Sequence, residues 1–170
     1  MSKAKKLGHW VRDYMHMAGF HGKSFMYLKP PKHYLGHIVE KKIPIILIQG
    51  VYTRWNFLKN FADPLSHLGH PIYVVENLGY NNKSIEYSAQ LVRKLIEEED
   101  LHKVVLLAHS KGGLIGKEVL LDYNNDGRVV RLIAIASPFS GSSIVHATPS
   151  KTLKELSPKS DIVQRQKERE

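Results

Sequence analysis

The stretch that decides the fold is "LLAHSKGG", residues 106–113. An apolar run that begins at residue 104 stops at the polar Ser110, and two glycines follow Lys111. A buried strand that runs straight into a helix needs a sharp turn, and only small side chains fit between that turn and its neighbours. The pattern therefore predicts a strand, a strained turn centred on Ser110 and a helix that begins directly after it.

Small residues flank the serine on both sides. Ala108 precedes it by two positions, and Gly112 and Gly113 follow it. This small-x-Ser-x-Gly pattern between a strand and a helix is the signature of a nucleophile elbow, which holds a serine hydroxyl at a helix N-terminus. The helix dipole and the free N–H groups there stabilise developing negative charge. We therefore predict that Ser110 is a nucleophile and that Ala108, His109, Gly112 and Gly113 support its turn.

Two other interpretations fit parts of the stretch. Serine is a favoured N-cap, so Ser110 would simply cap the helix that follows it. A phosphate-binding loop needs its glycines before the lysine, whereas Lys111 precedes both glycines. The order of residues excludes the phosphate loop, and the helix cap stays as the structural alternative.

The chain around this stretch alternates between strand and helix patterns. Short apolar runs are typical of strands buried on both faces, and they lie at residues 43–50, 72–76, 103–110 and 129–138. Helical spacing predicts helices between them: one within residues 54–68 with an irregularity at Pro64, one from near Ser84 through Ile96, and one over 111–122. The alternation predicts an α/β fold with a mostly parallel sheet and helices on both faces.

Charge divides the chain into regions. The 170 residues carry a net charge of +9, of which +7 falls in residues 1–42 and +2 in residues 43–170. We predict a basic N-terminal arm at 1–42, an α/β core at 43–149, and a polar tail at 150–170 that is a frayed helix or disordered. The arm is either a solvated extension or a weak contact for an anionic membrane surface. It lacks the aromatic-rich motif of a specific nucleic-acid binder.

Composition excludes several kinds of site. The absence of cysteine excludes disulfides, thiolate metal sites and a cysteine nucleophile. The spacing of the histidines in the arm matches no metal-ligand pattern, so we predict no metal site. No stretch approaches the roughly 18 apolar residues that span a bilayer, and no apolar segment follows the basic N-terminus as in a signal peptide. We therefore expect a cytoplasmic protein.

Three segments together resemble the α/β-hydrolase superfamily, and most closely its small bacterial lipases and esterases and its GPI inositol-deacylase-like group. The first is the elbow "AHSKGG" at 108–113. The second is "ILIQG" at 46–50, which is similar to the family's apolar strand ending in His-Gly, and the third is "ASPFSGS" at 136–142. The resemblance covers roughly 100 of the 170 residues.

The resemblance implies a mechanism and an oxyanion hole. It implies hydrolysis of a small-molecule or lipid carboxylic ester through an acyl-enzyme on Ser110, without a cofactor. The oxyanion would be held by the backbone N–H groups of Lys111 and Val51. Gln49 and Gly50 would form the oxyanion loop, with Gln49 in the place of the family's usual histidine. The Lys111 side chain is expected at the surface, either as a plain lysine or as a contact for a negative group of the substrate.

The resemblance also implies that the serine's partners are missing. In the superfamily an acid and then a histidine follow later strands than the serine, and the sequence offers no further strand after residues 129–138. Both partners would lie beyond residue 170, so the chain corresponds to the N-terminal two thirds of such an enzyme. Of the histidines present, His109 would point away from Ser110, and His146 has no carboxylate placed to orient it. The alternative function is a catalytically inactive binding or interaction module whose basic arm contacts acidic surfaces.

Overall fold

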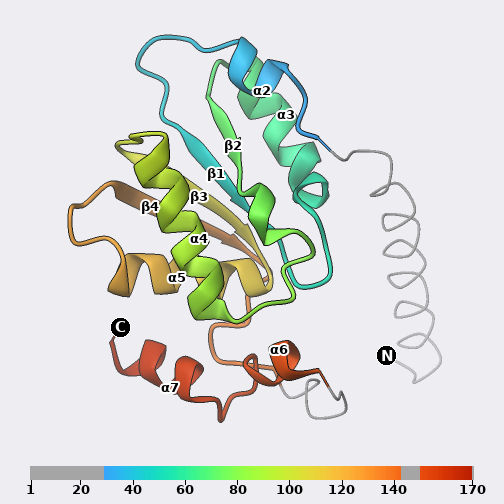
Figure 1. Ribbon diagram of the computed structural model, residues 1–170, viewed down its shortest axis with the longest axis vertical. Coiled ribbons are helices and arrows are strands. Elements are labelled where there is room, and N and C mark those ends of the chain that lie inside the picture. Colours follow the sequence, from blue (N-terminus) through green and yellow to red (C-terminus); the bar gives the residue numbers. More distant parts are fainter. Residues whose placement is uncertain (1–28, 143–149, 170) are drawn as a thin grey trace, which may run out of the picture.

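The structure, a computed structural model, describes residues 29–142 and 150–169 (Figure 1). Its centre is a four-stranded sheet in the order β2-β1-β3-β4, in which every neighbouring pair is parallel. The strands are β1 (Ile45–Ile48), β2 (Ile72–Val74), β3 (Val104–His109) and β4 (Val129–Ile135). Each strand lies inside one of the predicted apolar runs, and the predicted parallel α/β sheet is confirmed. Residues 1–28 of the predicted arm lie outside the described residues.

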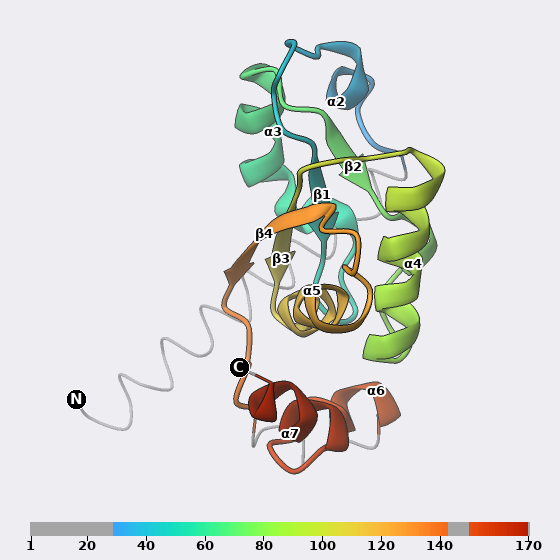
Figure 2. The same cartoon turned by 90° about the vertical axis from the view of Figure 1, so that its left-hand side faces the viewer.

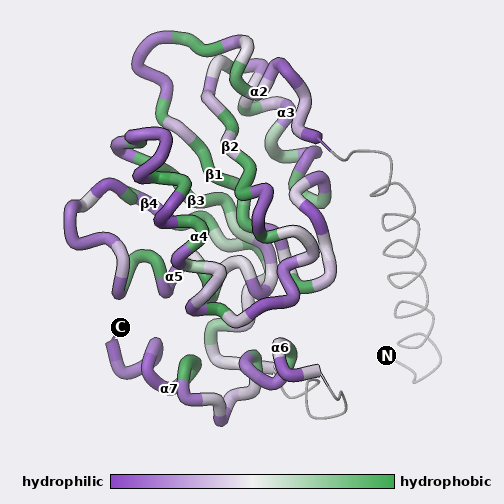
Figure 3. The backbone as a smooth tube through the Cα atoms, viewed as in Figure 1, coloured by the Kyte–Doolittle hydropathy of each residue, from purple (hydrophilic) through white to green (hydrophobic). Residues whose placement is uncertain are grey.

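Helices cover both faces of the sheet (Figure 2). One face carries α2 (His33–Gly36), the 3₁₀ turn η1 (Trp55–Leu58) and α3 (Lys59–His67). The other face carries the 3₁₀ turn η2 (Glu76–Leu78), α4 (Ile85–Glu98) and α5 (Lys111–Asp122). Because alternate side chains of a strand point to opposite faces, β1 sends Leu47 into the first cluster and Ile46 into the second. Hydrophobic residues concentrate along the central strands, and hydrophilic residues are frequent in the surrounding helices and loops (Figure 3).

The helix boundaries follow local signals in the sequence. Ser84 caps α4 as predicted, because its Oγ accepts a hydrogen bond from the backbone N–H of Tyr87 at 3.2 Å. The predicted helix after β1 begins as the 3₁₀ turn η1 and continues as α3, which contains Pro64. α3 is followed by Gly69 with a φ of +90°, a conformation that glycine adopts without strain.

The C-terminal residues 150–169 correct the prediction of a frayed or disordered tail. They form α6 (Lys151–Lys154) and α7 (Asp161–Glu168), and Leu156 and Val163 are buried in the same cluster as α5. Arg165 forms an ion pair with Glu118 of α5, whose Oε2 also accepts from Gln166 Nε2 at 2.8 Å. The polar composition suggested disorder, but these polar side chains bind α5 while two apolar ones fill the core.

The predicted boundary of the arm at residue 42 is also too late. Tyr34 of α2 is only 1% exposed, and its hydroxyl donates a hydrogen bond to Asp63 of α3 at 3.0 Å. The backbone N–H of Val39 donates to the carbonyl of Gly69 at 3.0 Å. The packed core therefore begins no later than Tyr34, and the lysines around it project from folded structure.

Among the described residues, no helix has the length and apolar character needed to cross a membrane.

Candidate active site

Ser110 occupies the turn between β3 and α5. Its backbone has φ 52° and ψ −121°, a combination that L-residues rarely adopt and that stores strain. The strain is held in place because the Ser110 N–H donates to the carbonyl of Ile135 at 2.9 Å. The Ser110 side chain makes no cap hydrogen bond to α5, so the helix-cap interpretation does not account for it. The half-buried hydroxyl is left at the N-terminus of the helix.

The two glycines after the serine are required by close contacts. A Cβ atom at Gly112 would lie 2.2 Å from the carbonyl oxygen of Ile48 in β1. A Cβ atom at Gly113 would lie 2.1 Å from the hydroxyl oxygen of Ser137, in the loop after β4. Ala108 is fully buried against the same side of the sheet. The small residues that the sequence places around Ser110 therefore let α5 approach β1 and the loop after β4 closely.

The loop after β1 lies directly against the serine. A Cβ atom at Gly50 would be 3.2 Å from Ser110 Cβ and 2.9 Å from His109 Nδ1, so only glycine fits there. The Thr53 hydroxyl donates to the Gly50 carbonyl at 2.9 Å and closes the loop into a turn. Within the described part of the chain, the backbone N–H groups of Val51 and Lys111 donate to no other backbone group.

Gln49 stabilises the loop after β1 through two hydrogen bonds. Its side-chain Nε2 donates to the backbone carbonyl of Gly79 at 3.1 Å, and its backbone carbonyl accepts from Asn81 Nδ2 at 2.6 Å. Both partners belong to the segment after β2. Asn81 is 1% exposed and has a φ of 50°, which asparagine tolerates better than most residues. Sequence reasoning did not find Asn81, because its role depends on contacts about 30 residues away in the chain.

The Lys111 side chain is buried, which corrects the expectation that it lies at the surface. It is 0% exposed, and its Nζ donates to the carbonyl of Asn81 at 3.2 Å, to Thr152 Oγ1 at 2.8 Å, and to the carbonyl of Lys83. Three acceptors make an ammonium group tolerable in the interior. Asn81 also binds the backbone carbonyl of Gln49. One hydrogen-bond network therefore connects the start of α5, which follows Ser110, with the loop after β1.

Burial shifts the pKa values of Lys111 and of its neighbour Glu155. Burial lowers the pKa of Lys111 to about 8, and nearby Glu155 acts in the opposite direction. Burial also raises the pKa of Glu155, whose carboxylate accepts a hydrogen bond from the Ile85 N–H at 3.0 Å. Lys111 is therefore a structural cation that holds α5, the segment after β2 and α6 together.

His109 lies under the turn with its side chain away from the serine. Its ring packs at a tilt against the ring of Phe57 of η1, with 4.3 Å between ring centroids, and its buried Nδ1 has no partner in the protein. Burial without a charged neighbour lowers its pKa, so the imidazole is neutral near pH 7. The sequence-based expectation that His109 packs under the elbow agrees with this position.

The described residues bring no histidine–carboxylate pair to Ser110. The two such pairs that they contain are His33 with Asp63, between α2 and α3, and His102 with Asp100, before β3 begins. His146 lies outside the described residues. In the part of the chain that the structure describes, no group of three His, Asp or Glu side chains comes together in a way that could hold a metal ion.

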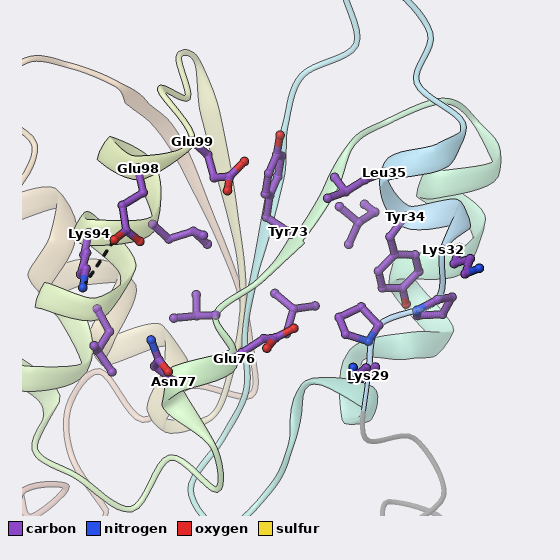
Figure 4. Close-up of a pocket in the computed structure, with 17 residues that line it drawn as sticks. Lys29, Lys32, Tyr34, Leu35, Tyr73, Glu76, Asn77, Lys94, Glu98 and Glu99 are labelled. Atoms are coloured by element: carbon purple, nitrogen blue, oxygen red, sulfur yellow. Dashed lines mark ion pairs between the residues drawn. The ribbon is translucent and has the colours of Figure 1, made fainter.

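A hollow of about 490 Å³ lies elsewhere, along the outer edge of β2 (Figure 4). One wall comes from α2 with Tyr34 and Leu35, and the other comes from the end of α4 with Glu98 and Glu99. Tyr73 of β2 stands between them. None of the residues that line this hollow belongs to the elbow or to the loop after β1, so it is separate from the candidate active site.

Comparison with known proteins gives a clear fold and little sequence similarity. No family model and no curated protein matches the chain. The Bacillus licheniformis lipase BlEst2 in its mature form matches with a TM-score of 0.64 and 16% identity, over 83% of this chain and 62% of that one. Its propeptide form matches with a TM-score of 0.65 and 16% identity, over 79% of this chain and 34% of that one. A Paleococcus ferrophilus monoacylglycerol lipase matches with a TM-score of 0.50 and 18% identity, over 63% and 42% of the two chains.

These matches identify the architecture. The chain has the α/β-hydrolase fold, as the elbow and its flanking segments predicted. It spans less than two thirds of the length of the lipases that it matches.

Proposed function

We propose that the protein is a serine hydrolase that cleaves carboxylic esters through an acyl-enzyme on Ser110. The observation that carries the proposal is the backbone of this residue, which is strained at φ 52° between β3 and the N-terminus of α5. Strain of this kind is kept where the surrounding structure enforces it and is concentrated at functional sites. The lipase-like fold supports the same reaction class.

In the proposed reaction Ser110 Oγ attacks the ester carbonyl carbon and loses its proton to a base. The tetrahedral oxyanion accepts hydrogen bonds from the N–H groups of Lys111 and Val51, each contributing about 3 kcal/mol to transition-state stabilisation. The C–O bond to the alcohol then breaks, the alcohol leaves with a proton, and water hydrolyses the acyl-enzyme. Small-molecule and lipid esters both fit this chemistry, and no cofactor takes part.

The proposed reaction needs a base that the described residues do not place beside Ser110. A serine hydroxyl is a weak nucleophile until a base accepts its proton, and the described histidine beside Ser110 faces Phe57 instead. We therefore expect slow acylation and little turnover from the 170-residue chain on its own.

A fluorophosphonate probe and a short-chain p-nitrophenyl ester test these points separately. Covalent labelling of the chain should disappear in Ser110→Ala and persist in Ser137→Ala, a matched change in the neighbouring loop. Labelling that survives Ser110→Ala would refute the assignment of the nucleophile. Fast, Ser110-dependent ester turnover by the 170-residue chain would instead refute the missing base.

The second candidate function is a non-catalytic module that binds anionic membrane surfaces through basic residues near its N-terminus. It is favoured by Lys32, Lys41 and Lys42, which are exposed and form no ion pair within the described residues. Co-sedimentation with phosphatidylglycerol vesicles, but not phosphatidylcholine vesicles, should fall steeply with salt. Deletion of residues 1–28 keeps Tyr34 in place and measures how much of that binding residues 1–28 provide. Folded protein that neither labels nor binds vesicles would contradict both candidates.

A further inference from the structure

Three residues that line one small pocket each carry a buried polar atom without a partner in the protein. The atoms are Gln49 Oε1, Arg54 Nε and Trp55 Nε1, half of the six such side-chain atoms in the described residues. All three residues line a pocket of about 130 Å³, together with Val75, Glu76 and Gly79. Buried polar groups in folded proteins are almost always hydrogen-bonded, so this convergence indicates a guest that supplies the missing partners.

The pocket lies beside the candidate active site, at the ends of β1 and β2. Gln49 precedes Gly50, which contacts Ser110, but the Gln49 side chain extends toward Gly79. Val75 and Glu76 follow β2 directly, and Arg54 immediately precedes Trp55, the first residue of η1. Apart from Gln49, which belongs to the proposed oxyanion loop, none of the residues lining the pocket takes part in the proposed reaction.

The donors and acceptors in the pocket define the guest. Arg54 Nε and Trp55 Nε1 can only donate, so both need an acceptor oxygen, and the positive charge of Arg54 favours a carboxylate. The Arg54 guanidinium is held over the Tyr80 ring at 4.6 Å, which fixes its position. Gln49 Oε1 can only accept, and the carboxylate of Glu76 at the exposed mouth also accepts, so the guest must carry a donor as well.

The volume limits the guest to a few heavy atoms. A pocket of about 130 Å³ has room for roughly four water molecules and is well below the size of sites that take drug-like ligands. We propose that this pocket binds a small carboxylate that carries a hydroxyl or ammonium donor next to it. The carboxylate faces Arg54 and Trp55, and the donor faces Gln49 and Glu76.

The Trp55 indole provides a direct readout. Trp10 is the only other tryptophan in the sequence, so protein labelled with ¹⁵N-tryptophan gives two indole signals, and a Trp10→Phe variant assigns them. Glycolate and glycine are the probes, and at least one should shift the Trp55 signal saturably at roughly millimolar concentration, as expected for so small a ligand. Acetate lacks the donor and glycerol lacks the carboxylate. Each should therefore bind at least about tenfold more weakly than the better of the two probes.

The two probes also separate the two possible donors. Tighter binding of glycolate identifies a hydroxyl, and tighter binding of glycine identifies an ammonium group that faces Glu76. The absence of a saturable shift with both probes would mean that the pocket holds water only and would overturn the proposal. Acetate binding as tightly as the better probe would overturn it too, because the predicted donor would then be irrelevant.

Two arginine variants test the assignment of the carboxylate. Arg54→Met should weaken binding at least about tenfold, whereas Arg131→Met, a change on exposed β4, should leave it unchanged. Trp55→Phe removes the indole N–H together with part of the buried ring, and calorimetry with the better probe should show a loss in affinity of about tenfold. Circular dichroism checks that each variant is folded. Binding that is unchanged in both folded pocket variants would contradict the proposed site.

Discussion

β3 and β4 lie side by side in register, yet among the residues that the structure describes only β3 is covered on both faces. Leu107 of β3 is 4% exposed, whereas its register partner Ile133 of β4 is 45% exposed. α5 covers one face of both strands, and η1 and α3 cover the other face of β3. The comparison shows that the parts around Ser110 rest on the densely packed side, while the open face of β4 contributes little packing energy.

The largest expected difference in unfolding free energy is between alanine variants of these two register partners. Leu107→Ala should lower the free energy of unfolding by about 3–4 kcal/mol, because it leaves a cavity under the elbow. Ile133→Ala should cost under about 1 kcal/mol, because half of that side chain is already in water. Urea denaturation of both variants measures the two values. Equal losses would mean that the open face of β4 is covered in solution.

The next largest loss of stability is expected where the backbone of α5 lies against β1. Gly112→Ala places a methyl group against the Ile48 carbonyl, and we expect a loss of about 3 kcal/mol in unfolding free energy. Gly36 provides the matched control, since a Cβ atom there would contact nothing within 4 Å. Gly36→Ala should be neutral or slightly stabilising. A tolerated Gly112→Ala would contradict the close approach of α5 to β1.

The buried ammonium of Lys111 should make stability depend on pH. Its pKa falls from 10.5 in the unfolded chain to about 8 in the folded one, so between these values the unfolded chain holds a proton that the folded one has lost. Stability therefore rises with pH across this window, by about 3 kcal/mol, and the full cost of burying the charge is present below pH 8.

The measurement is urea denaturation from pH 7.5 to 10.5 for the wild type, Lys111→Met and Lys154→Met. The rise attributable to Lys111 should be missing in Lys111→Met and retained in Lys154→Met, which changes an exposed lysine of α6. Parallel pH profiles for all three proteins would rule out a buried Lys111.

The smallest expected change in stability comes from releasing the backbone strain at Ser110. Glycine adopts φ 52° and ψ −121° without a steric penalty, so Ser110→Gly should stabilise the fold by about 1 kcal/mol while removing the nucleophile. Ser110→Ala keeps the Cβ atom and should leave stability nearly unchanged. The denaturation midpoints of the two variants separate backbone strain from loss of the hydroxyl, and a destabilised Ser110→Gly would contradict the strain.

The sequence predicts those features that depend on neighbours along the chain. The four strands follow from apolar runs, the start of α4 from Ser84, and the turn at Ser110 from the small residues around it. Each of these signals is local, because a strand buried on both faces or a turn without room for Cβ atoms constrains the residues at that position directly.

The features that the sequence did not predict depend on residues far apart in the chain. Lys111 is buried because Asn81, Lys83 and Thr152 bring their oxygens to its Nζ from separations of 28 to 41 residues. α7 is anchored to α5 by Arg165 and Gln166, and their polarity alone resembles that of a disordered tail. No pattern within a short window distinguishes a lysine or glutamine that has such partners from one that is solvated.

The strand order β2-β1-β3-β4 also determines how the chain can fold. β1 is an inner strand, but β3, its partner on one side, is made only after α3, β2 and α4 have been synthesised. A growing chain on the ribosome therefore exposes the apolar β1 until residue 109 has emerged. Long-range parallel pairing of this kind is slow, on the order of milliseconds to seconds, and unpaired apolar strands aggregate during the delay. We expect chaperones to improve the yield of soluble protein during expression.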